Sequence, residues 1–368
     1  MMDELQQARE EIDRVDREMA QLFVRRMRAV EQVADYKRAH GLPVFDGARE
    51  DAVIAKNSAR VEDEDIRPYY VEFLRDTMKA SRHYQRKRLS GMKVAFSGIE
   101  GAFASIAAAR ILPDAERLPC PDFSAAYDAV VKGDADVAVL PIENSTAGEV
   151  GQVVDLMFGG SLVVTGIYDF SITHHLLALP GTKLENVKTV ISHPQALDQC
   201  GAFLHKNGMK AISAVNTAVA AKQVLDGGDH TVAAIASEET AKLYGLEVLA
   251  RAINETGLNT TRFAVLSRAA VTDKSTGKHF ILMFTVRNEA GFLAKAVNVI
   301  GAHGFNMRCL RSRPMKDLLW QYYFYVELEG EPESPACRQM LSDLSKFCEK
   351  LKVLGSFRYP ATLDTDEN

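Results

Sequence analysis

An arginine interrupts the apolar stripe of the first helix that the sequence predicts. Apolar residues recur three and four positions apart from Leu5 onward, which is typical of an amphipathic helix with a coiled-coil-like seam. Seven residues after Met19 the stripe reaches Arg26, and Lys37 lies about three turns further along nearly the same face. Burying a cation is costly unless it meets an anion. The pattern therefore indicates either an interhelical salt bridge or a site for an anionic ligand.

Two further predicted helices carry polar residues that could complete such a site. Gly41 and Pro43 end the first helix, and helical spacing resumes at about residues 46–58 and 65–88. The second helix carries acidic residues and an arginine, whereas the third presents two neutral polar residues four positions apart and hence on one face. These positions are Asp46, Arg49 and Glu50, followed by Ser81 and Gln85. Together they predict a polar pocket inside a helical bundle.

The helical segment, residues 1–90, resembles the small all-helical chorismate mutases. The positions that match this family's active-site pattern are, in order, Arg9, Arg26, Lys37, Asp46, Arg49, Glu50, Ser81 and Gln85. The resemblance implies a unimolecular rearrangement of chorismate to prephenate. Such a reaction needs a compact substrate conformer and stabilisation of negative charge on the ether oxygen, rather than a nucleophile or a metal.

The resemblance also implies roles for the polar side chains of the pocket. Lys37 and Gln85 would donate hydrogen bonds to the ether oxygen of the substrate. Asp46 and Glu50 would hold the ring hydroxyl. Ser81 would help to bind a carboxylate.

Arg9 and Arg26 would bind the two carboxylates of chorismate through their forked guanidinium groups. They lie seventeen residues apart, which is about 25 Å along a straight helix, and Lys37 lies beyond Arg26 in the opposite direction. A site between Arg26 and Lys37 cannot easily recruit Arg9 of the same chain. We therefore expect a partner chain to supply Arg9 in the intertwined dimer that the resemblance implies, as a homodimer or a dimer of dimers.

Beyond Gly91 the sequence changes to short β-rich runs separated by helical segments, which predicts an α/β fold with largely parallel sheets. Four polar motifs lie mostly where a β-run ends and a helix begins, the place where α/β folds bind ligands. Each motif could also be a helix cap or a turn. They are Pro141-Ile142-Glu143-Asn144-Ser145-Thr146, Ser192-His193-Pro194-Gln195, Asn216-Thr217-Ala218 and Asn259-Thr260-Thr261-Arg262-Phe263.

These motifs resemble those of prephenate dehydratase, with Thr261-Arg262-Phe263 as the signature, over residues 93–268. The resemblance implies two α/β lobes with a cleft, and a reaction in which prephenate loses its ring hydroxyl and ring carboxylate. A general acid near the departing hydroxyl would help, and Thr261 is the candidate as a positioned hydrogen-bond donor. Arg262 would either pair with a carboxylate or brace the cleft. The residues that would orient the substrate are Asn144, Ser145, Thr146, Gln195, Thr217 and Phe263.

A polar linker at residues 272–277 precedes the last segment, residues 278–362. The predicted order is strand, helix, strand, strand, helix and strand, which is the ferredoxin-like pattern. Its second helix is predicted at residues 335–351 and its last strand at residues 353–358. The segment resembles an ACT regulatory domain, which implies dimerisation and an amino-acid effector at the interface. The effector-binding motifs would be Gly291-Phe292-Leu293-Ala294 and Arg311-Ser312-Arg313-Pro314.

Two residues of these motifs depart from the pattern of dehydratases that bind phenylalanine. Arg311 stands where that pattern has a glutamate, and Phe292 stands where it has an alanine. Two expectations remain open. Either phenylalanine inhibits the enzyme through this segment, or the segment dimerises with weakened or changed ligand choice.

The composition excludes several classes of protein. Of 368 residues 47% are hydrophobic and 25% charged, which is typical of two or three globular domains. A net charge of −5 argues against a nucleic-acid partner, and no apolar run approaches the length of a membrane helix. Five cysteines without a Cys-x-x-Cys pair suit reduced thiols in the cytoplasm. His174 and His175 are adjacent in a predicted strand and so point to opposite faces, and we expect neither a metal nor another cofactor.

We therefore expect a multidomain protein with an all-α domain (1–90), a two-lobed α/β domain (91–271) and an α+β ferredoxin-like domain (278–362). It would be a bifunctional enzyme that converts chorismate to prephenate and then prephenate to phenylpyruvate. One alternative is a dehydratase whose helical domain is vestigial. Another is a solute-binding or amino-acid-sensing protein. Thr261→Ala separates binding from catalysis, because it should leave a binding protein intact but abolish an enzyme.

Overall fold

The computed structural model describes residues 4–39, 44, 47–88, 92–268, 279–316, 318–357 and 361–363. Asp46, the side chain of Lys37 and the predicted linker at residues 272–277 lie outside the described residues. The chain divides into a first compact unit up to Met92 and a second from Lys93. In the described part of the chain, no helix is long and apolar enough to cross a membrane.

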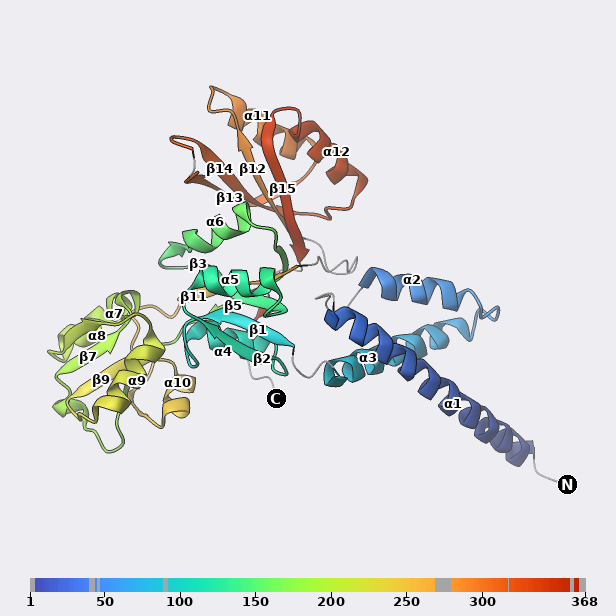
Figure 1. Cartoon of the computed structure of the whole chain (residues 1–368), viewed down its shortest axis with the longest axis horizontal. Helices are drawn as coiled ribbons and strands as arrows, with labels where there is room; N and C mark the ends of the chain where they lie inside the picture. Colours follow the sequence, from blue (N-terminus) through green and yellow to red (C-terminus); the bar gives the residue numbers. More distant parts are fainter. Residues whose placement is uncertain are drawn as a thin grey trace. The chain divides into compact units, whose positions relative to one another are not determined.

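The first unit consists of three helices, as predicted: α1 (Glu4–Ala39), α2 (Gly47–Ser58) and α3 (Arg67–Arg88) (Figure 1). α1 contains neither glycine nor proline, so no residue within it breaks the backbone hydrogen bonding. α3 packs against both α1 and α2. Among the described apolar side chains of this unit, only Ala34 and Met78 are buried. In the described structure the side chains from Leu5 to Arg25 are all exposed, and the first part of the apolar stripe of α1 is among them.

The second unit begins with a lobe built on a seven-stranded sheet. The strand order is β16-β5-β11-β3-β1-β2, and β4 pairs with the end of β3. Leu140 and Val153 belong to the apolar core that the sheet shares with the helices of this lobe. The bounds are β1 (Lys93–Ser97), α4 (Phe103–Ile111), β2 (Glu116–Cys120), α5 (Phe123–Lys132), β3 (Val137–Asn144), β4 (Gly148–Glu149), α6 (Gly151–Gly159), β5 (Val163–Ser171), β11 (Thr260–Ser267) and β16 (Ala361–Thr362).

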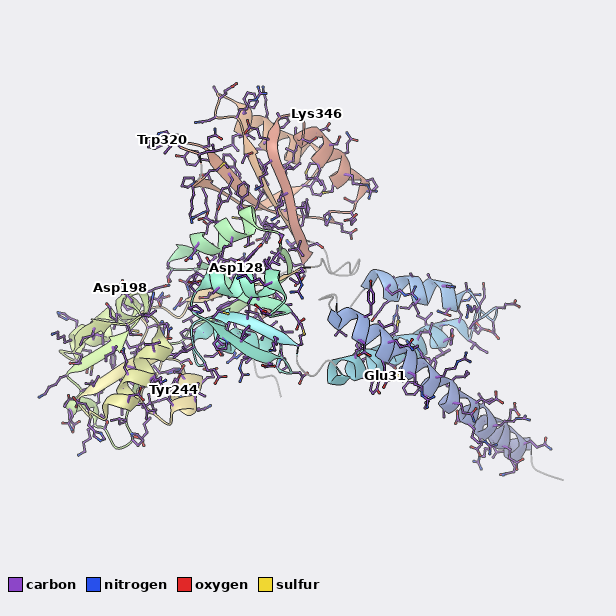
Figure 2. All side chains as sticks on the ribbon, in the orientation of Figure 1. Glu31, Asp128, Asp198, Tyr244, Trp320 and Lys346 are labelled. Atoms are coloured by element: carbon purple, nitrogen blue, oxygen red, sulfur yellow. The ribbon has the colours of Figure 1, made fainter. Side chains whose placement is uncertain are left out.

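The second lobe holds a five-stranded sheet in the order β10-β6-β9-β7-β8. The chain enters this lobe after β5 and returns to the first lobe at β11. Tyr244, labelled in Figure 2, donates a hydrogen bond across the lobes to the carbonyl oxygen of Glu100 at 2.8 Å. The bounds are β6 (His175–Ala178), η1 (Leu184–Asn186), β7 (Thr189–Ser192), α7 (Pro194–Gln199), α8 (Gly201–Lys206), β8 (Lys210–Ser213), α9 (Thr217–Gly227), β9 (Val232–Ala236), α10 (Glu238–Tyr244) and β10 (Glu247–Ala250).

Both sheets are mixed, so the prediction of largely parallel sheets was wrong. Among the described strands, parallel pairing joins β1 to β2 and β3, β7 to β8 and β9, and β16 to β5. β11 lies antiparallel between β3 and β5, and β6 lies antiparallel between β9 and β10. Sequential parallel strands need a crossover, usually a helix, whereas β11 follows a loop from the second lobe. A buried strand has the same apolar residue pattern whether it pairs parallel or antiparallel, so the sequence did not reveal the direction of β11.

The C-terminal subdomain (residues 279–357) has the predicted order of elements, and its four strands form an antiparallel sheet ordered β13-β14-β12-β15. The prediction of a helix at residues 335–351 was wrong beyond Leu344. Residues from Cys348 to Leu351 pair with β12 instead, so tertiary pairing overrides local helix preference. The bounds are β12 (His279–Val286), α11 (Phe292–Ala302), β13 (Asn306–Pro314), β14 (Tyr322–Glu329), α12 (Pro335–Leu344) and β15 (Cys348–Phe357).

The C-terminal subdomain and the first lobe share a core. One face of its sheet packs beneath α11 and α12, whereas Met283, Tyr323 and Leu354 on the other face belong to the core of the first lobe. The backbones of β15 and β5 approach closely at Gly355, which has a φ of +137°. A Cβ at this position would clash with the carbonyl oxygen of Val164. Glycine is therefore required at this contact.

Candidate active sites

Packing of α1 on α3 brings Arg26 next to Ser81. The Arg26 guanidinium donates a hydrogen bond to Ser81 Oγ, which in turn donates to the carbonyl oxygen of Thr77 at 2.7 Å. Burial lowers the pKa of Arg26, and the charge of Glu50 partly opposes this effect. The arginine that interrupts the apolar stripe therefore meets a neutral hydroxyl on the neighbouring helix.

Glu50 forms its ion pair with Arg82 of α3. Arg82 was not predicted as a site residue, because nothing in its spacing separates it from the other basic residues of α3. Tyr84 donates to Glu31 of α1 at 2.5 Å, and Glu31 is labelled in Figure 2. These pairs hold α3 against both of its neighbours.

Gln85 is a buried amide one turn beyond Ser81. Its side chain is 7% exposed, and its Oε1 has no hydrogen-bond partner among the described residues. Leaving a buried polar group without a partner costs about 1–3 kcal/mol. Turning the amide over would place its NH2 group at the same point, so Gln85 can serve a ligand as either donor or acceptor.

Two of the predicted arginines have exposed side chains. Arg9 is in the exposed first half of α1, and Arg49 is exposed in the first turn of α2. The predicted residues that the described part of the helical unit brings together are Arg26, Glu50, Ser81 and Gln85.

A cavity of about 400 Å³ lies between the two lobes of the second unit. Strands β3 and β11 of the first lobe and the starts of α7 and α9 in the second lobe contribute to its walls. The four polar motifs, although far apart in the sequence, therefore meet at one place. The predicted residues that line this cavity are Asn144, Gln195, Thr217, Thr261 and Phe263.

Hydrogen bonds from the backbone determine how the Asn144 side chain is oriented. Its Oδ1 accepts from the amides of Thr146 at 3.1 Å and Ala147 at 2.9 Å, and a backbone N–H can only donate. The Nδ2 group therefore points the other way and donates to Thr261 Oγ1 at 2.9 Å. Because Thr261 accepts this bond, its own hydroxyl proton is free to be donated into the cavity.

Side-chain amides of α7 link the two lobes beside Asn144. Gln195 donates to Asn144 Oδ1 at 3.1 Å. Gln199 donates to Thr146 Oγ1 at 2.6 Å and accepts from Asn259 Nδ2 at 2.9 Å. Asn144 Nδ2 in turn donates to Asn259 Oδ1 at 2.8 Å. The network gives each amide one orientation, because reversing any of them would set two donors or two acceptors against each other.

His174 lines the cavity as a neutral side chain. Burial lowers its pKa, and its Nε2 lies 2.9 Å from Gln199 Oε1. That oxygen can only accept, so the ring proton is on Nε2. Nδ1 is then an acceptor, and it has no hydrogen-bond partner in the described part of the chain.

The predicted residues Ser145, Thr146 and Arg262 are not among those that line this cavity. Ser145 Oγ donates to the carbonyl oxygen of Leu258 at 2.7 Å and ties the end of β3 to the loop before β11. Arg262 pairs with Asp169 at 2.9 Å and with Glu327 of the C-terminal subdomain at 3.4 Å. Burial alone would lower the pKa of Arg262, but its hydrogen bond to Asp169 and the neighbouring carboxylates raise it above its ordinary value.

The first effector motif lies at the start of α11. Gly291 is the N-cap of this helix in the left-handed conformation, with a φ of +85°. Phe292 follows it, and the ammonium of Lys295 lies 4.6 Å from the centre of its ring. Leu293 packs against the core beneath α11, and Ala294 is exposed.

The second effector motif lies on β13, and its two arginines face carboxylates of the first lobe. Arg311 pairs with Glu143, and Arg313 pairs with Asp155 at 3.0 Å and Glu149 at 2.7 Å. The alternate residues of the motif, Ser312 and Pro314, are exposed. This motif therefore contacts the strand that carries Asn144.

Polar residues that line the cavity but were not predicted as site residues include Asn259, Gln199 and His174. Asn259 lies within one of the four polar motifs, and Gln199 lies four residues after Gln195, hence on the same helix face. His174 stands out in the sequence only as half of a histidine pair. Spacing was the one sequence signal that could have identified Gln199.

Comparison with known proteins agrees with this arrangement. Residues 8–86 match the family model "Chorismate mutase type II", and residues 94–271 match "Prephenate dehydratase". The bifunctional chorismate mutase/prephenate dehydratase of Aquifex aeolicus is 33% identical over 370 residues, covering 98% of this chain and 99% of that protein. The enzyme of the same name from Enterobacter agglomerans is 31% identical over 366 residues, covering 95% and 94%.

A solved structure resembles the part of the chain beyond the helical unit. The prephenate dehydratase of Arthrobacter aurescens in complex with L-Phe is 27% identical, with a TM-score of 0.67, and the match covers 73% of this chain and 90% of that one. The two matched families together span both sites, and the relatives carry both in one chain. This protein therefore belongs to the bifunctional chorismate mutase/prephenate dehydratases of phenylalanine biosynthesis, which rearrange chorismate to prephenate and convert prephenate to phenylpyruvate.

Proposed function

We propose that prephenate binds in the cavity between the lobes and that Thr261 donates a hydrogen bond to its departing ring hydroxyl. The observation that carries this proposal is the fixed Asn144 amide, which leaves the Thr261 hydroxyl as a donor. As the ring C–O bond breaks, the electron pair of the bond to the ring carboxylate moves into the ring and carbon dioxide leaves. The leaving hydroxide takes up a proton from the medium to become water, so the overall reaction consumes one proton. A donor at this point stabilises the developing charge.

Backbone groups would bind the carboxylates of prephenate. None of the described side chains that line the cavity is Asp, Glu, Lys or Arg, and burial lowers the pKa of both His174 and His193. α4 and α9 both begin at the cavity, α4 without a side-chain cap and α9 capped by Asn216. The N-terminal ends of helices attract anions, each by about 0.3–1 kcal/mol. Phe263 would contact the ring of the substrate.

Thr261→Ala and Thr261→Ser test this assignment. The alanine variant should lose about 10²-fold or more of its dehydratase kcat, whereas serine keeps the hydroxyl and should keep most of the activity. Mutase activity of the same preparation is the control for folding and concentration. A Thr261→Ala variant that forms phenylpyruvate at the wild-type rate would refute the proposal.

For the mutase reaction we place chorismate beside Arg26, Ser81 and Gln85, with Glu50, Arg49, Lys37 and Asp46 completing the site. The half-buried Arg26 suits a carboxylate, and Gln85 offers a buried amide without a partner. Arg9 would come from a second copy of the chain. The apolar stripe supports this, because Ile12, Val15, Met19 and Leu22 are exposed in the described part of one chain, and a second copy could cover them.

Mixing two inactive variants tests the shared site. Arg9→Ala and Lys37→Ala should each abolish mutase activity alone. Hybrid dimers hold one site that lacks both changes, so the mixture should recover part of the activity. Absence of recovery after subunit exchange has been verified would contradict the proposal, whether the protein is a homodimer or a dimer of dimers.

The C-terminal subdomain is, in this proposal, an ACT regulatory domain of ferredoxin-like fold that binds phenylalanine. Its βαββαβ order and the L-Phe bound to the Arthrobacter relative support the assignment. The measurement is phenylpyruvate formation from chorismate with and without phenylalanine. A decrease with phenylalanine is expected, and indifference to it would favour a dimerisation domain with a changed ligand.

A further inference from the structure

Two neighbouring cross-strand pairs of β3 and β11 face opposite sides of the sheet. Thr261 lies opposite Asn144, and the next pair is Arg262 opposite Glu143. Successive residues of a strand point to opposite faces. Asn144 and Thr261 line the cavity between the lobes. The Glu143 and Arg262 pair lies on the other face, where residues of the C-terminal subdomain meet it.

The contacts on that face are ion pairs between subdomains. Arg311 of β13 pairs with Glu143, and Glu327 of β14 pairs with Arg262 at 3.4 Å. Arg262 is also held by Asp169 of β5 at 2.9 Å. The side chains of Arg311 and Glu143 are only 29% and 26% exposed, so salt screens their attraction less than at an open surface.

The charge of Arg311 is maintained by this setting. Burial alone would lower its pKa, but its hydrogen bond to Glu143 raises the pKa above the ordinary value. Glu149 lies 4.0 Å from the same guanidinium. A glutamate at position 311, as in the phenylalanine-binding motif, would instead place its carboxylate beside Glu143 and Glu149. The positive charge of Arg311 therefore complements the carboxylates of the first lobe, which would repel a glutamate at this position.

We propose that Arg311 is a positioning residue of the dehydratase reaction, supplied by the C-terminal subdomain. It holds Glu143, which is joined by one peptide bond to Asn144, and Asn144 orients the Thr261 hydroxyl. Arg311 thus acts through the end of β3 and does not touch the substrate. The inference rests on the proposed roles of Asn144 and Thr261.

The test compares Arg311→Met, Arg311→Lys and Arg311→Glu in the full-length enzyme. Because small displacements of catalytic groups cost up to about 10²-fold, we expect Arg311→Met to lower dehydratase kcat about tenfold while KM for prephenate stays within about twofold. Arg311→Lys keeps the charge and should stay within about threefold of the wild type. Arg311→Glu should be less active than Arg311→Met, because it adds a repelling carboxylate. Mutase kcat should not change.

Arg308→Met is the matched control. Arg308 lies on the same strand and borders the same cavity, and it pairs at 3.1 Å with Glu329 of the same subdomain. It should keep the dehydratase kcat of the wild type. Glu143→Gln removes the charge from the other partner of the ion pair, and it should reproduce the loss of dehydratase kcat seen with Arg311→Met. This variant tests the positioning role even if an Arg311 variant folds poorly.

Three results would overturn the inference: equal activity of the Arg311→Met and Arg308→Met variants, wild-type activity of Arg311→Glu, or a loss in which mutase activity falls in parallel. These results are distinguishable from failure of the proposed function. If Thr261→Ala retains dehydratase activity, the role of Thr261 is wrong. If Thr261→Ala is inactive while Arg311→Met equals the wild type, only the positioning role is wrong.

Discussion

Replacing Asn144 with aspartate tests whether the amide determines the direction of the Thr261 hydrogen bond. In the wild type Asn144 Nδ2 donates to Thr261 Oγ1 at 2.9 Å, while its Oδ1 accepts from Ala147 and Thr146. A carboxylate keeps the acceptor but loses the donor. The Thr261 hydroxyl would then donate to the new carboxylate rather than to the substrate.

The size of the effect follows from the bond that must be broken. A hydrogen bond to a charged group contributes about 1.5–3 kcal/mol, and Thr261 must give it up before it can serve the departing hydroxyl. At about 1.4 kcal/mol for each factor of ten, dehydratase kcat should fall roughly 10- to 100-fold. KM should change less, because the bond to the departing hydroxyl gains strength only as charge develops there.

The pH profile distinguishes this mechanism from general damage. Once protonated, the new carboxyl carries an O–H that can donate to Thr261 as the amide did, so activity of Asn144→Asp should recover as the pH falls. Asn144→Ala should show no such recovery. The assay is phenylpyruvate formation from prephenate over a range of pH, with mutase activity as the control. A kcat for Asn144→Asp within about threefold of the wild type, at all pH values, would refute the reasoning.

Two further predictions concern the contact between the C-terminal subdomain and the first lobe. Gly355→Ala should lower the free energy of unfolding by about 1–3 kcal/mol in urea denaturation. At a φ of +137° the new Cβ would clash with the carbonyl oxygen of Val164. A variant as stable as the wild type would contradict this contact. Lys352 donates to the carbonyl oxygens of Met157 and Gly160 at 2.7 and 2.6 Å, and burial lowers its pKa from 10.5 to about 8, with Lys350 adding to the shift. Below its folded pKa the Lys352 amine is charged, and burying that charge opposes folding. Between about pH 8 and 10.5 the unfolded chain binds more protons than the folded one. The stability of the wild type relative to Lys352→Met should therefore rise with pH across that window. A stability difference between the two proteins that is constant from about pH 7 to about pH 10 would contradict the assignment.

The sequence determined the local structure and pointed to several of the residues that the fold brings together. Helical spacing identified the three helices of the first unit, and short polar motifs identified the segments around Thr261 and Asn144. These features depend on residue types at short spacing, which backbone geometry turns directly into a helix face or a strand end. Arg26 was found in the same way, as a cation on an apolar stripe.

Only the tertiary structure decided how distant segments meet. The antiparallel insertion of β11 between β3 and β5 depends on strand pairing between segments far apart in the chain, and it places Thr261 opposite Asn144. The orientation of the Thr261 hydroxyl follows from a network that includes Gln199 and Asn259, and no local spacing reveals it. The partner of Arg311 likewise depends on how the C-terminal subdomain packs on the first lobe. Local sequence shows that a charge is present, but the energy of that charge depends on which groups the fold brings beside it.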